Sequence, residues 1–293
     1  MAAFPADGPV LGDAPGYTTR TLSDVPNAQA MRVRIWSPRL SDGYVPQGVA
    51  AGDGYLWVAT YRSVDPRQNK GQCRVFQVDP TDGAVAGQFD LPASCGHAGG
   101  IAHTGDRYLY VADTRRLFRI DTQAALALGR CEPLACTEVA LNGTLRGSAL
   151  AYRPGILWLA AYTPSANGTG RLWQVSEDRL MALIAGGGGA IDERAADREL
   201  PIATQTQGAA VAADGSLWLT QSNGRSGQLQ NLDARTGRML TTWPMPAGIE
   251  DIEFAPDGRL WAVSEAGSQR WNAWPSFFPV VFALDVGALQ PRP

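Results

Sequence analysis

The sequence predicts an all-β protein, a five-bladed β-propeller made of four-stranded antiparallel blades. Three observations carry this prediction: a hairpin pattern repeats five times, a third strand follows each hairpin, and one further strand precedes the first copy. The second strand of each hairpin is an aromatic–aliphatic run, and the copies begin 43 to 60 residues apart. The runs are Leu56-Trp57-Val58, Leu109-Tyr110-Val111, Leu157-Trp158-Leu159, Leu217-Trp218-Leu219 and Leu260-Trp261-Ala262. Strand-based repeats of this length are typical of propellers.

The first two strands of each blade are predicted from the turn that joins them. Each aromatic run follows a tight turn such as Gly52-Asp53-Gly54 or Pro256-Asp257-Gly258. Before the turn lies a short run of small apolar residues, as in Gly48-Val49-Ala50. Apolar runs on both sides of an Asp-Gly turn indicate a β-hairpin.

The third and fourth strands complete each blade. The third strand ends in an acid or a serine in each copy: Val75–Asp79, Leu117–Asp121, Leu172–Ser176, Leu229–Asp233 and Val281–Asp285. A fourth strand follows in residues such as Ala86–Leu91 and Met239–Trp243. These repeats place the blades at about 45–92, 96–141, 146–184, 206–244 and 249–285.

The fifth blade lacks a fourth strand at its own end of the chain. Residues 31–37 precede the first blade and alternate as a strand does, so we expect them to close the ring as the outer strand of blade five. Closure of this kind joins the two ends of the chain and protects a sheet edge. Residues 1–16 are rich in Ala, Pro, Gly and Asp and are predicted to be a flexible tail, which leaves 17–293 as a single domain.

Composition narrows the possible functions. Hydrophobic residues make up 45% of the chain, enough for a large core, and the net charge of −3 comes without a basic stripe, which argues against nucleic-acid binding. No apolar run approaches the length of roughly 18 residues that spans a membrane. Lys70 is the only lysine among 25 basic residues and lies in a polar loop, which disfavours Schiff-base chemistry.

The four cysteines are predicted to form two disulfides, Cys131–Cys136 and Cys73–Cys95. No Cys-x-x-Cys metal spacing is present, and the alternative is four reduced, buried thiols. Disulfides indicate an oxidising compartment. The N-terminal segment resembles a mature tail after removal of a signal peptide, so we expect a periplasmic or secreted protein.

The channel mouth is the expected site, because the innermost strands of all blades begin there. Aligning these strands by their turns gives one column of entry residues: Val45, His97, Arg146, Gln207 and Glu250. The next column inward is Pro46, Ala98, Gly147, Gly208 and Asp251.

Three types of group in these columns suit catalysis. His97 is a candidate acid or base, Glu250 or Asp251 its carboxylate partner, and Arg146 a holder of anions. The alternative is a set of polar groups that satisfy one another, with Arg146 and Glu250 as a plain ion pair. The second histidine, His103, is expected at the opposite end of its strand and exposed.

The loops between second and third strands are expected to form a rim around this mouth. Their candidate ligand-binding residues are Tyr61, Arg62, Asp113, Tyr162, Asn223 and Glu265, beside Gln207 of the entry column. The fifth loop, 269–279, concentrates aromatic residues, including Trp271 and Trp274. Such a loop can bind a sugar, an aromatic ligand or a partner, or it can fold back as a hydrophobic cover. The insert at 185–205 is either a lid or a surface loop.

Segments such as Gly99-Gly100-Ile101-Ala102 followed by Tyr108–Thr114 resemble NHL-type, regucalcin/gluconolactonase and strictosidine-synthase-like propellers. The resemblance lies in the repeat units across most of the chain, and those families usually have six blades. Their calcium-dependent members hold the ion with Glu, Asp and Asn at the channel mouth. Here the resemblance would place calcium near Glu250 and Asp251, although His97, Arg146 and Gln207 replace much of that ligand set.

Two functions remain open from the sequence. The first is an extracytoplasmic hydrolase or lyase that acts on a small molecule or glycan at the channel mouth. The second is a non-catalytic propeller that binds a ligand, a glycan or a protein. The candidate residues differ from blade to blade, which favours one unique site over a repeated lectin site and therefore favours the enzyme.

Overall fold

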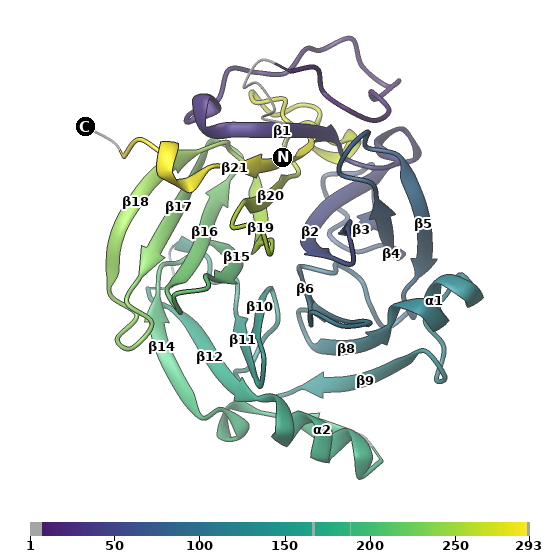
Figure 1. The fold of residues 1–293 in the computed structure, drawn as a ribbon, viewed down its shortest axis with the longest axis vertical. Helices are drawn as coiled ribbons and strands as arrows, with labels where there is room; N and C mark the ends of the chain where they lie inside the picture. The colour runs from purple at the N-terminus through teal and green to yellow at the C-terminus, as the bar shows by residue number, and fades with distance from the viewer. Residues whose placement is uncertain (1–7, 166–167, 188, 292–293) are drawn as a thin grey trace.

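The computed structural model describes residues 8–165, 168–187 and 189–291, and the blades follow one another in chain order around a central axis (Figure 1). Each blade is an antiparallel sheet of four successive strands, except where noted below. Blade one contains β2 (Tyr44–Gly52), β3 (Tyr55–Arg62), β4 (Cys73–Val78) and β5 (Val85–Asp90). Blade two contains β6 (Gly100–His103), β7 (Tyr108–Asp113), β8 (Arg116–Asp121) and β9 (Cys136–Leu141).

The remaining blades repeat the same order. Blade three contains β10 (Ala149–Arg153), β11 (Ile156–Ala160), β12 (Gly170–Ser176) and β14 (Arg198–Ile202). Blade four contains β15 (Thr206–Val211), β16 (Leu217–Asn223), β17 (Ser226–Leu232) and β18 (Met239–Met245). Blade five contains β19 (Ile249–Phe254), β20 (Leu260–Ser264), β21 (Val280–Leu284) and β1 (Met31–Trp36). The five-bladed, four-stranded architecture is confirmed.

The N-terminal strand closes the ring as expected. β1 pairs antiparallel with β21, with Arg34 opposite Phe282. The segment before β1 differs from the expected flexible tail where it is described. Leu11 forms a parallel bridge with Ile35, and the Gly12 amide donates to the Asp82 carbonyl at 3.0 Å. Residues 8–16 therefore lie against the propeller, and residues 1–7 of the predicted tail are outside the described part.

The hydrophobic core consists of layers between neighbouring blades. The aromatic residue of the second strand is buried in four blades and half-buried, as Trp218, in blade four. It belongs to a core cluster shared with a neighbouring blade, as Trp57 does with Leu109 and Phe118, and Trp261 with Val49. Burying a side chain of this size contributes about 1.5–3 kcal/mol. The repeated aromatic residues therefore hold neighbouring blades together.

The innermost strands approach one another closely because most of their channel-facing residues are small. Opposite the aromatic residue stand Ala50, Ala102, Ala151 and Ala210 in the first four blades, whereas blade five has Glu253. A Cβ atom added to Gly208 would lie 2.5 Å from the Asp251 Cα, so β15 requires glycine there.

Two acids of β19 bond to neighbouring innermost strands. Asp251 Oδ2 accepts the Ile101 amide at 2.9 Å, and its Oδ1 accepts the Ala209 amide at 3.4 Å. Glu253 accepts the Ala51 amide at 2.6 Å and the His103 amide at 3.2 Å. One strand of blade five is therefore tied to blades one, two and four across the channel.

The insert at 185–205 mostly completes blades rather than covering the site. Helix α2 (Glu177–Ala185), capped by the Ser176 side chain, precedes β13 (Gly189–Ile191) and β14. β14 is the fourth strand of blade three, and β13 pairs in parallel with β9, which gives blade two a fifth strand. Helix α1 (Thr122–Leu128) joins β8 to β9 in blade two, and α1 and α2 lie on the face turned to the viewer in Figure 1. We call this the helix face.

One of the two expected disulfides is present. Cys131 and Cys136 are bonded, with Cα atoms 5.2 Å apart. Cys73 and Cys95 are free, buried thiols instead of the second predicted disulfide. The Cys73 Sγ atom lies 3.7 Å from the Gly71 carbonyl oxygen, and burial raises the pKa of the Cys73 thiol, with a hydrogen bond to Cys95 as the next cause.

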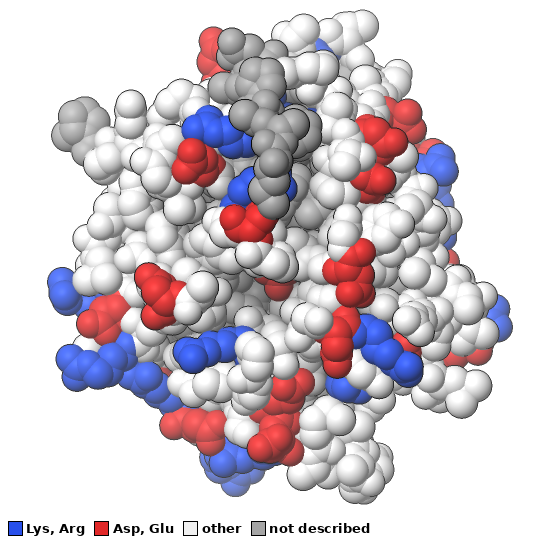
Figure 2. Space-filling model, in the orientation of Figure 1, with Lys and Arg blue, Asp and Glu red and all other residues white. Residues whose placement is uncertain are grey.

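The surface carries charges of both signs. Figure 2 shows acidic and basic side chains interspersed around a central hollow on the helix face. None of the helices in the described residues is long and apolar enough to cross a membrane.

Candidate functional site

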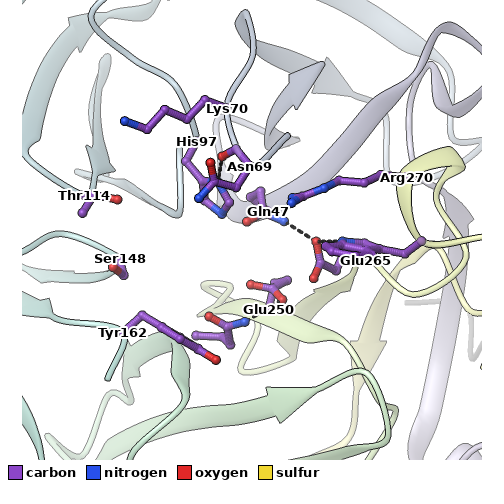
Figure 3. Close-up of a pocket in the computed structure, with 12 residues that line it drawn as sticks. Gln47, Asn69, Lys70, His97, Thr114, Ser148, Tyr162, Glu250, Glu265 and Arg270 are labelled. Atoms are coloured by element: carbon purple, nitrogen blue, oxygen red, sulfur yellow. Dashed lines mark hydrogen bonds between the residues drawn. The ribbon is translucent and has the colours of Figure 1, made fainter. Parts of the chain in front are cut away.

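A pocket of about 430 Å³ opens at the channel mouth opposite the helix face, and we call it the channel-mouth pocket. All five blades or the loops that follow their strands contribute to it (Figure 3). Its lining residues are Gln47, Asn69, Lys70, His97, Thr114, Ser148, Tyr162, Gln207, Glu250, Glu265, Arg270 and Trp271. Most of these side chains are polar, so the pocket suits a small polar ligand.

Three β-bulges turn side chains into this pocket. The pairing of β2 with β3 skips Gln47, that of β15 with β16 skips Gln207, and that of β19 with β20 shifts at Glu250 and Asp251. A bulged residue leaves the regular alternation of the strand and can aim its side chain in a new direction. The bulges are the local reason why Gln47, Gln207 and Glu250 meet.

The expected entry column was out of register in the first three blades. Val45 is fully buried in the core, and the position equivalent to Gln207 in its strand is Gln47, two residues later. The same shift places Ser148 in the pocket, where Arg146 was expected. The sequences were aligned by the turns at the ends of these strands. Bulges and loops at the beginnings of the strands change the number of residues between the turn and the channel mouth, which caused the error.

The floor of the pocket is a pair of carboxyl groups, Glu250 from β19 and Glu265 from the residue after β20 (Figure 3). Burial raises the pKa of Glu250 well above its usual range, and the charge of Glu265 and a hydrogen bond to it raise it further. Burial also raises the pKa of Glu265, to about 7, although the Arg270 charge and hydrogen bonds to neighbouring side chains lower it. Burial thus raises the pKa of both groups, more so for Glu250, which favours a proton on Glu250 when Glu265 is ionised.

Neutral donors hold the two carboxyl groups in place. Glu265 Oε2 accepts hydrogen bonds from Gln47 Nε2 at 2.9 Å and from Trp271 Nε1 at 2.7 Å. Glu250 Oε1 accepts one from Gln207 Nε2 at 3.0 Å. Hydrogen bonds to the charged form favour that form, so Gln47 and Trp271 make Glu265 the carboxylate of the pair.

Arg270 supplies a buried positive charge beside the pair. Its guanidinium lies 4.1 Å from the centre of the Trp271 ring, and it donates to the Tyr61 hydroxyl and to the Pro66 carbonyl. The Arg270 charge lowers the pKa of both Glu250 and Glu265, which opposes the effect of burial. Tyr61, expected as a rim residue, is buried beneath the pocket and anchors Arg270.

The aromatic loop 269–279 folds back onto the protein. The Trp271 ring stacks on Trp274 at 4.5 Å between centroids, and it also contacts the Arg270 guanidinium. Trp274 in turn packs against Gly224, where an added Cβ atom would lie 3.0 Å from the ring. Trp271 and Trp274 are both half-buried; Trp271 donates its indole N–H to Glu265, and Trp274 lines a separate surface pocket with Asn223 and Arg225. Ligand binding by these two tryptophans stays a prediction.

His97 lies on the pocket wall and stacks on Tyr61, with ring centroids 4.6 Å apart. Its Nδ1 atom is 2.7 Å from the Asn69 carbonyl oxygen. A carbonyl only accepts, so Nδ1 carries the proton and Nε2 keeps a lone pair when the ring is neutral. Burial lowers the pKa of His97, which favours this neutral form.

Several expected site residues have other roles. Asp251 does not line the pocket and instead bonds to the backbone of β6 and β15. Arg146 donates to the Gly143 carbonyl at 2.8 Å and to its own loop, so the Arg146–Glu250 ion pair is not formed. Asp113 accepts the Gly96 amide at 3.1 Å and so supports the segment that carries His97.

Of the remaining rim residues, one lines the pocket and two lie outside its lining. Tyr162 lines the pocket and is 42% exposed, which leaves its ring available to a ligand. Arg62 donates to the Asp42 carbonyl, and Asn223 accepts the Arg225 amide, both outside the pocket lining.

His103 corrects a further expectation. Its side chain is buried, with Nδ1 accepting the Gly105 amide at 3.0 Å and Nε2 lying 3.2 Å from Asp53 Oδ2. It therefore belongs to the turns of the helix face and is not the exposed residue that was expected.

Six pocket residues were not foreseen. They are Gln47, Asn69, Lys70, Thr114, Ser148 and Arg270. Gln47 had a usable signal, because Gln47-Gly48 and Gln207-Gly208 occupy equivalent places before an apolar run. Asn69 and Lys70 come from a loop whose path the sequence does not determine.

The channel-mouth residues do not fit the calcium site that the family resemblance implied. Burial raises the pKa of both Glu250 and Glu265, which favours a protonated pair over two metal-binding carboxylates, and the Arg270 charge acts on both groups. Within the described residues, no group of three or more His, Cys, Asp or Glu side chains is placed to hold a metal ion.

The fold and the channel-mouth pocket define the class of this protein: a five-bladed β-propeller with an asymmetric polar pocket at one mouth of its channel. No model of a protein family and no curated protein matches the sequence. Among solved structures, the glutaminyl cyclase of Myxococcus xanthus is similar over 83% of this chain and 93% of that chain, with 14% identity and a TM-score of 0.51.

Two further solved structures are less similar. A glucose dehydrogenase of Thermus thermophilus matches 82% of this chain and 96% of that chain, with 18% identity and a TM-score of 0.47. The Pan2 WD40 domain of Neurospora crassa matches 88% of this chain and 69% of that chain, with 15% identity and a TM-score of 0.46. The likeness to the glutaminyl cyclase, at 14% identity, concerns the fold alone.

Proposed function

We propose that the protein is a hydrolase that cleaves an acyl bond, in an ester, lactone or amide of a small molecule, at the channel-mouth pocket. The observation that carries the proposal is the hydrogen-bonded Glu250–Glu265 pair on the pocket floor. Two carboxyl groups that share one proton place a general acid and a general base side by side.

The closeness of the two carboxyl groups favours acyl hydrolysis over glycoside hydrolysis. A glycosidase needs its carboxyl groups about 5 Å apart or more, on opposite sides of the sugar bond. Glu265 raises the pKa of Glu250 through its charge and a hydrogen bond, so we take the two groups to be neighbours that act on one side of a reacting centre. A carbonyl attacked by water needs both groups at one place: a base for the water and an acid for the carbonyl oxygen.

Each carboxyl group ends the reaction in the protonation state in which it began. Glu265 takes a proton from water as the water oxygen bonds to the carbonyl carbon, and Glu250 gives its proton to the carbonyl oxygen. The tetrahedral intermediate then loses its leaving group, which receives the proton from Glu265, while a hydroxyl proton returns to Glu250. The products are the free acid and the alcohol or amine, and the pair returns to its starting state.

The rest of the pocket supports binding of the substrate. Gln207, Ser148, Thr114 and Tyr162 offer amide and hydroxyl groups around the pair. The Cys131–Cys136 disulfide supports an oxidising compartment, so we place the enzyme in the periplasm or outside the cell. The mechanism requires no metal ion or cofactor.

Glu265→Gln and Glu250→Gln test this proposal against a panel of 4-nitrophenyl esters, aryl amides and lactones. We expect each substitution to lower kcat/KM by about 10²–10⁴-fold, the usual contribution of a general acid or base. Glu132→Gln, at a half-buried residue of the disulfide loop that pairs with Arg130 outside the pocket lining, is the matched control and should keep full activity. If no compound is hydrolysed, or if both variants keep wild-type rates, a propeller that only binds its ligand is the better interpretation.

A further inference from the structure

Lys70 differs from every other basic residue of the chain in type, and it lies in the channel-mouth pocket. The sequence has 25 lysine and arginine residues, of which Lys70 alone is lysine. Lysine carries a compact charge with three donors on a flexible stem, which suits a single carboxylate or phosphate group. Figure 3 shows Lys70 across the pocket from Glu250 and Glu265.

The wall around Lys70 is built from two bonded segments. The Gly71 amide donates to the Gly96 carbonyl at 2.9 Å, and His97 bonds to the Asn69 carbonyl at 2.7 Å. The Lys70 stem packs on Gly96, where an added Cβ atom would lie 3.2–3.3 Å from the stem carbons. Gly96 is itself held by the Asp113 carboxyl. The base of the Lys70 side chain is therefore fixed, and its ammonium end is directed along the pocket wall.

The Lys70 charge has no counter-ion in the described part of the chain. None of the ion pairs between described residues involves Lys70, whereas Arg270 already offsets the charge of the Glu250–Glu265 pair. Further positive charge lies beyond the same wall. Burial lowers the pKa of Arg146, and the nearby Arg115 charge, next to Thr114 of the pocket, lowers it further. On the wall opposite the carboxyl pair, Lys70 therefore carries a positive charge that forms no ion pair with a described residue, whereas Arg146 has the Glu193 charge near it.

We propose that Lys70 binds an anionic group of the substrate, a carboxylate or a phosphate, while the carboxyl pair acts on the substrate at the other side of the pocket. The substrate is then an acyl compound with a negative charge remote from the bond that is cleaved. The acyl part of this statement rests on the proposed function, whereas the anion subsite stands on the position and charge of Lys70 alone.

A single lysine makes the subsite directly measurable without knowledge of the substrate. Trinitrobenzenesulfonate modifies free amines, and peptide mass mapping separates modified Lys70 from the N-terminal amine. We expect millimolar succinate or inorganic phosphate to slow modification of Lys70 several-fold, with the stronger of the two identifying the preferred anion. The neutral succinamide should have no effect. Equal rates with and without both anions would overturn the proposal.

A matched pair of esters then tests Lys70 in turnover. Mono-4-nitrophenyl succinate carries a carboxylate, and 4-nitrophenyl butyrate is a neutral ester of similar size. For Lys70→Gln we expect KM for the charged ester to rise about 10- to 100-fold, the effect of losing one charge-assisted hydrogen bond. KM for the neutral ester should change little, and Lys70→Arg should recover part of the loss.

Arg67→Gln is the control for long-range charge, because Arg67 lies on the same loop, is exposed and pairs with Asp65 outside the pocket. It should leave KM for both esters unchanged. If neither ester is hydrolysed but anions still protect Lys70, the proposed hydrolase function fails and the anion subsite remains. If both esters are hydrolysed by Lys70→Gln as by the wild type, and no anion protects Lys70, the subsite is refuted while the hydrolase function remains.

Discussion

Glu265 shows how single residues tune this site. Its carboxyl group is buried, which raises its pKa, but an indole N–H, an amide and a guanidinium bring that pKa back to about 7. A base with a pKa near the working pH combines sufficient ionisation with sufficient basicity. Glu250 accepts the Gln207 amide but no indole N–H, and burial with the Glu265 and Asp251 charges keeps its pKa well above the usual range. The neighbours of each carboxyl group therefore favour a different role for it.

Trp271→Phe should shift the pH dependence of activity. The indole hydrogen bond is the largest influence that lowers the pKa of Glu265, so its loss raises that pKa. Activity that requires the Glu265 carboxylate then begins at higher pH, and the acidic limb of the pH–kcat/KM profile should move upward. Trp274→Phe keeps a ring in the stack and touches no carboxyl group, so its profile should match the wild type. An unmoved limb in Trp271→Phe would show that the indole does not tune the base.

Asp251→Asn should destabilise the fold without a role in chemistry. Both Asp251 oxygens accept backbone amides of β6 and β15, and an asparagine NH₂ group would face one of these donors. We expect a loss of about 1–3 kcal/mol in the free energy of unfolding, measured with urea. The exposed Asp13→Asn is the control. Unchanged stability would mean that these contacts do not hold the channel together.

At the scale of elements, the sequence predicted most of the strands but not their irregularities. Turn residues and aromatic runs determine hairpins locally, so all five blades and the closing strand could be predicted. The bulges at Gln47, Gln207 and Glu250 depend on how five innermost strands fit around one axis, which is a long-range property. For this reason Glu250 and Gln207 were predicted in the site, whereas Gln47 and Ser148 were missed.

Residues in the middle of loops were also missed from the sequence. Glu265 was identified as a rim acid because it directly follows a strand, while Asn69 and Lys70 lie mid-loop with no local signal. β14 was missed because α2 and β13 separate it from the third strand of its blade.

Gly208→Ala tests the close approach of innermost strands. An added Cβ atom would lie 2.5 Å from the Asp251 Cα and 2.6 Å from the Glu250 carbonyl oxygen, so β19 must move. Overpacking of this kind costs about 1–3 kcal/mol, which a urea titration detects. Because β19 carries Glu250, activity should fall as well. Gly186→Ala, where the added atom makes ordinary contacts, should be neutral; equal effects of the two substitutions would contradict the packing described for β15 and β19.

At the scale of the whole molecule, buried acids make stability depend on pH. Burial raises the pKa of Glu253 to about 8 and that of Glu265 to about 7, and it raises those of Glu250 and Asp251 too. A carboxyl group with a raised pKa binds its proton more tightly in the folded state. Its stabilising effect is complete below the unfolded pKa near 4.5 and is lost as pH rises to the folded pKa.

The free energy of unfolding should therefore fall between pH 5 and pH 8, by a few kcal/mol on the scale of about 1.4 kcal/mol per pKa unit. Urea titrations across this range measure the slope. Glu253→Gln should flatten the part of the curve near pH 7–8, where the wild type loses stability through Glu253. Stability that rises across this range would contradict the burial of these acids in the channel.

The most direct test of the central claim is the protonation state of the Glu250–Glu265 pair, measured by infrared difference spectroscopy of the protonated carboxyl C=O band. We expect wild-type protein to show a band that is lost as pH rises through about 7, and Glu265→Gln to lack that titration. This result would establish a shared proton at the pocket floor without any substrate. If the wild type and Glu265→Gln titrate identically between pH 5 and pH 9, the pair holds no shared proton and the acid–base mechanism is wrong.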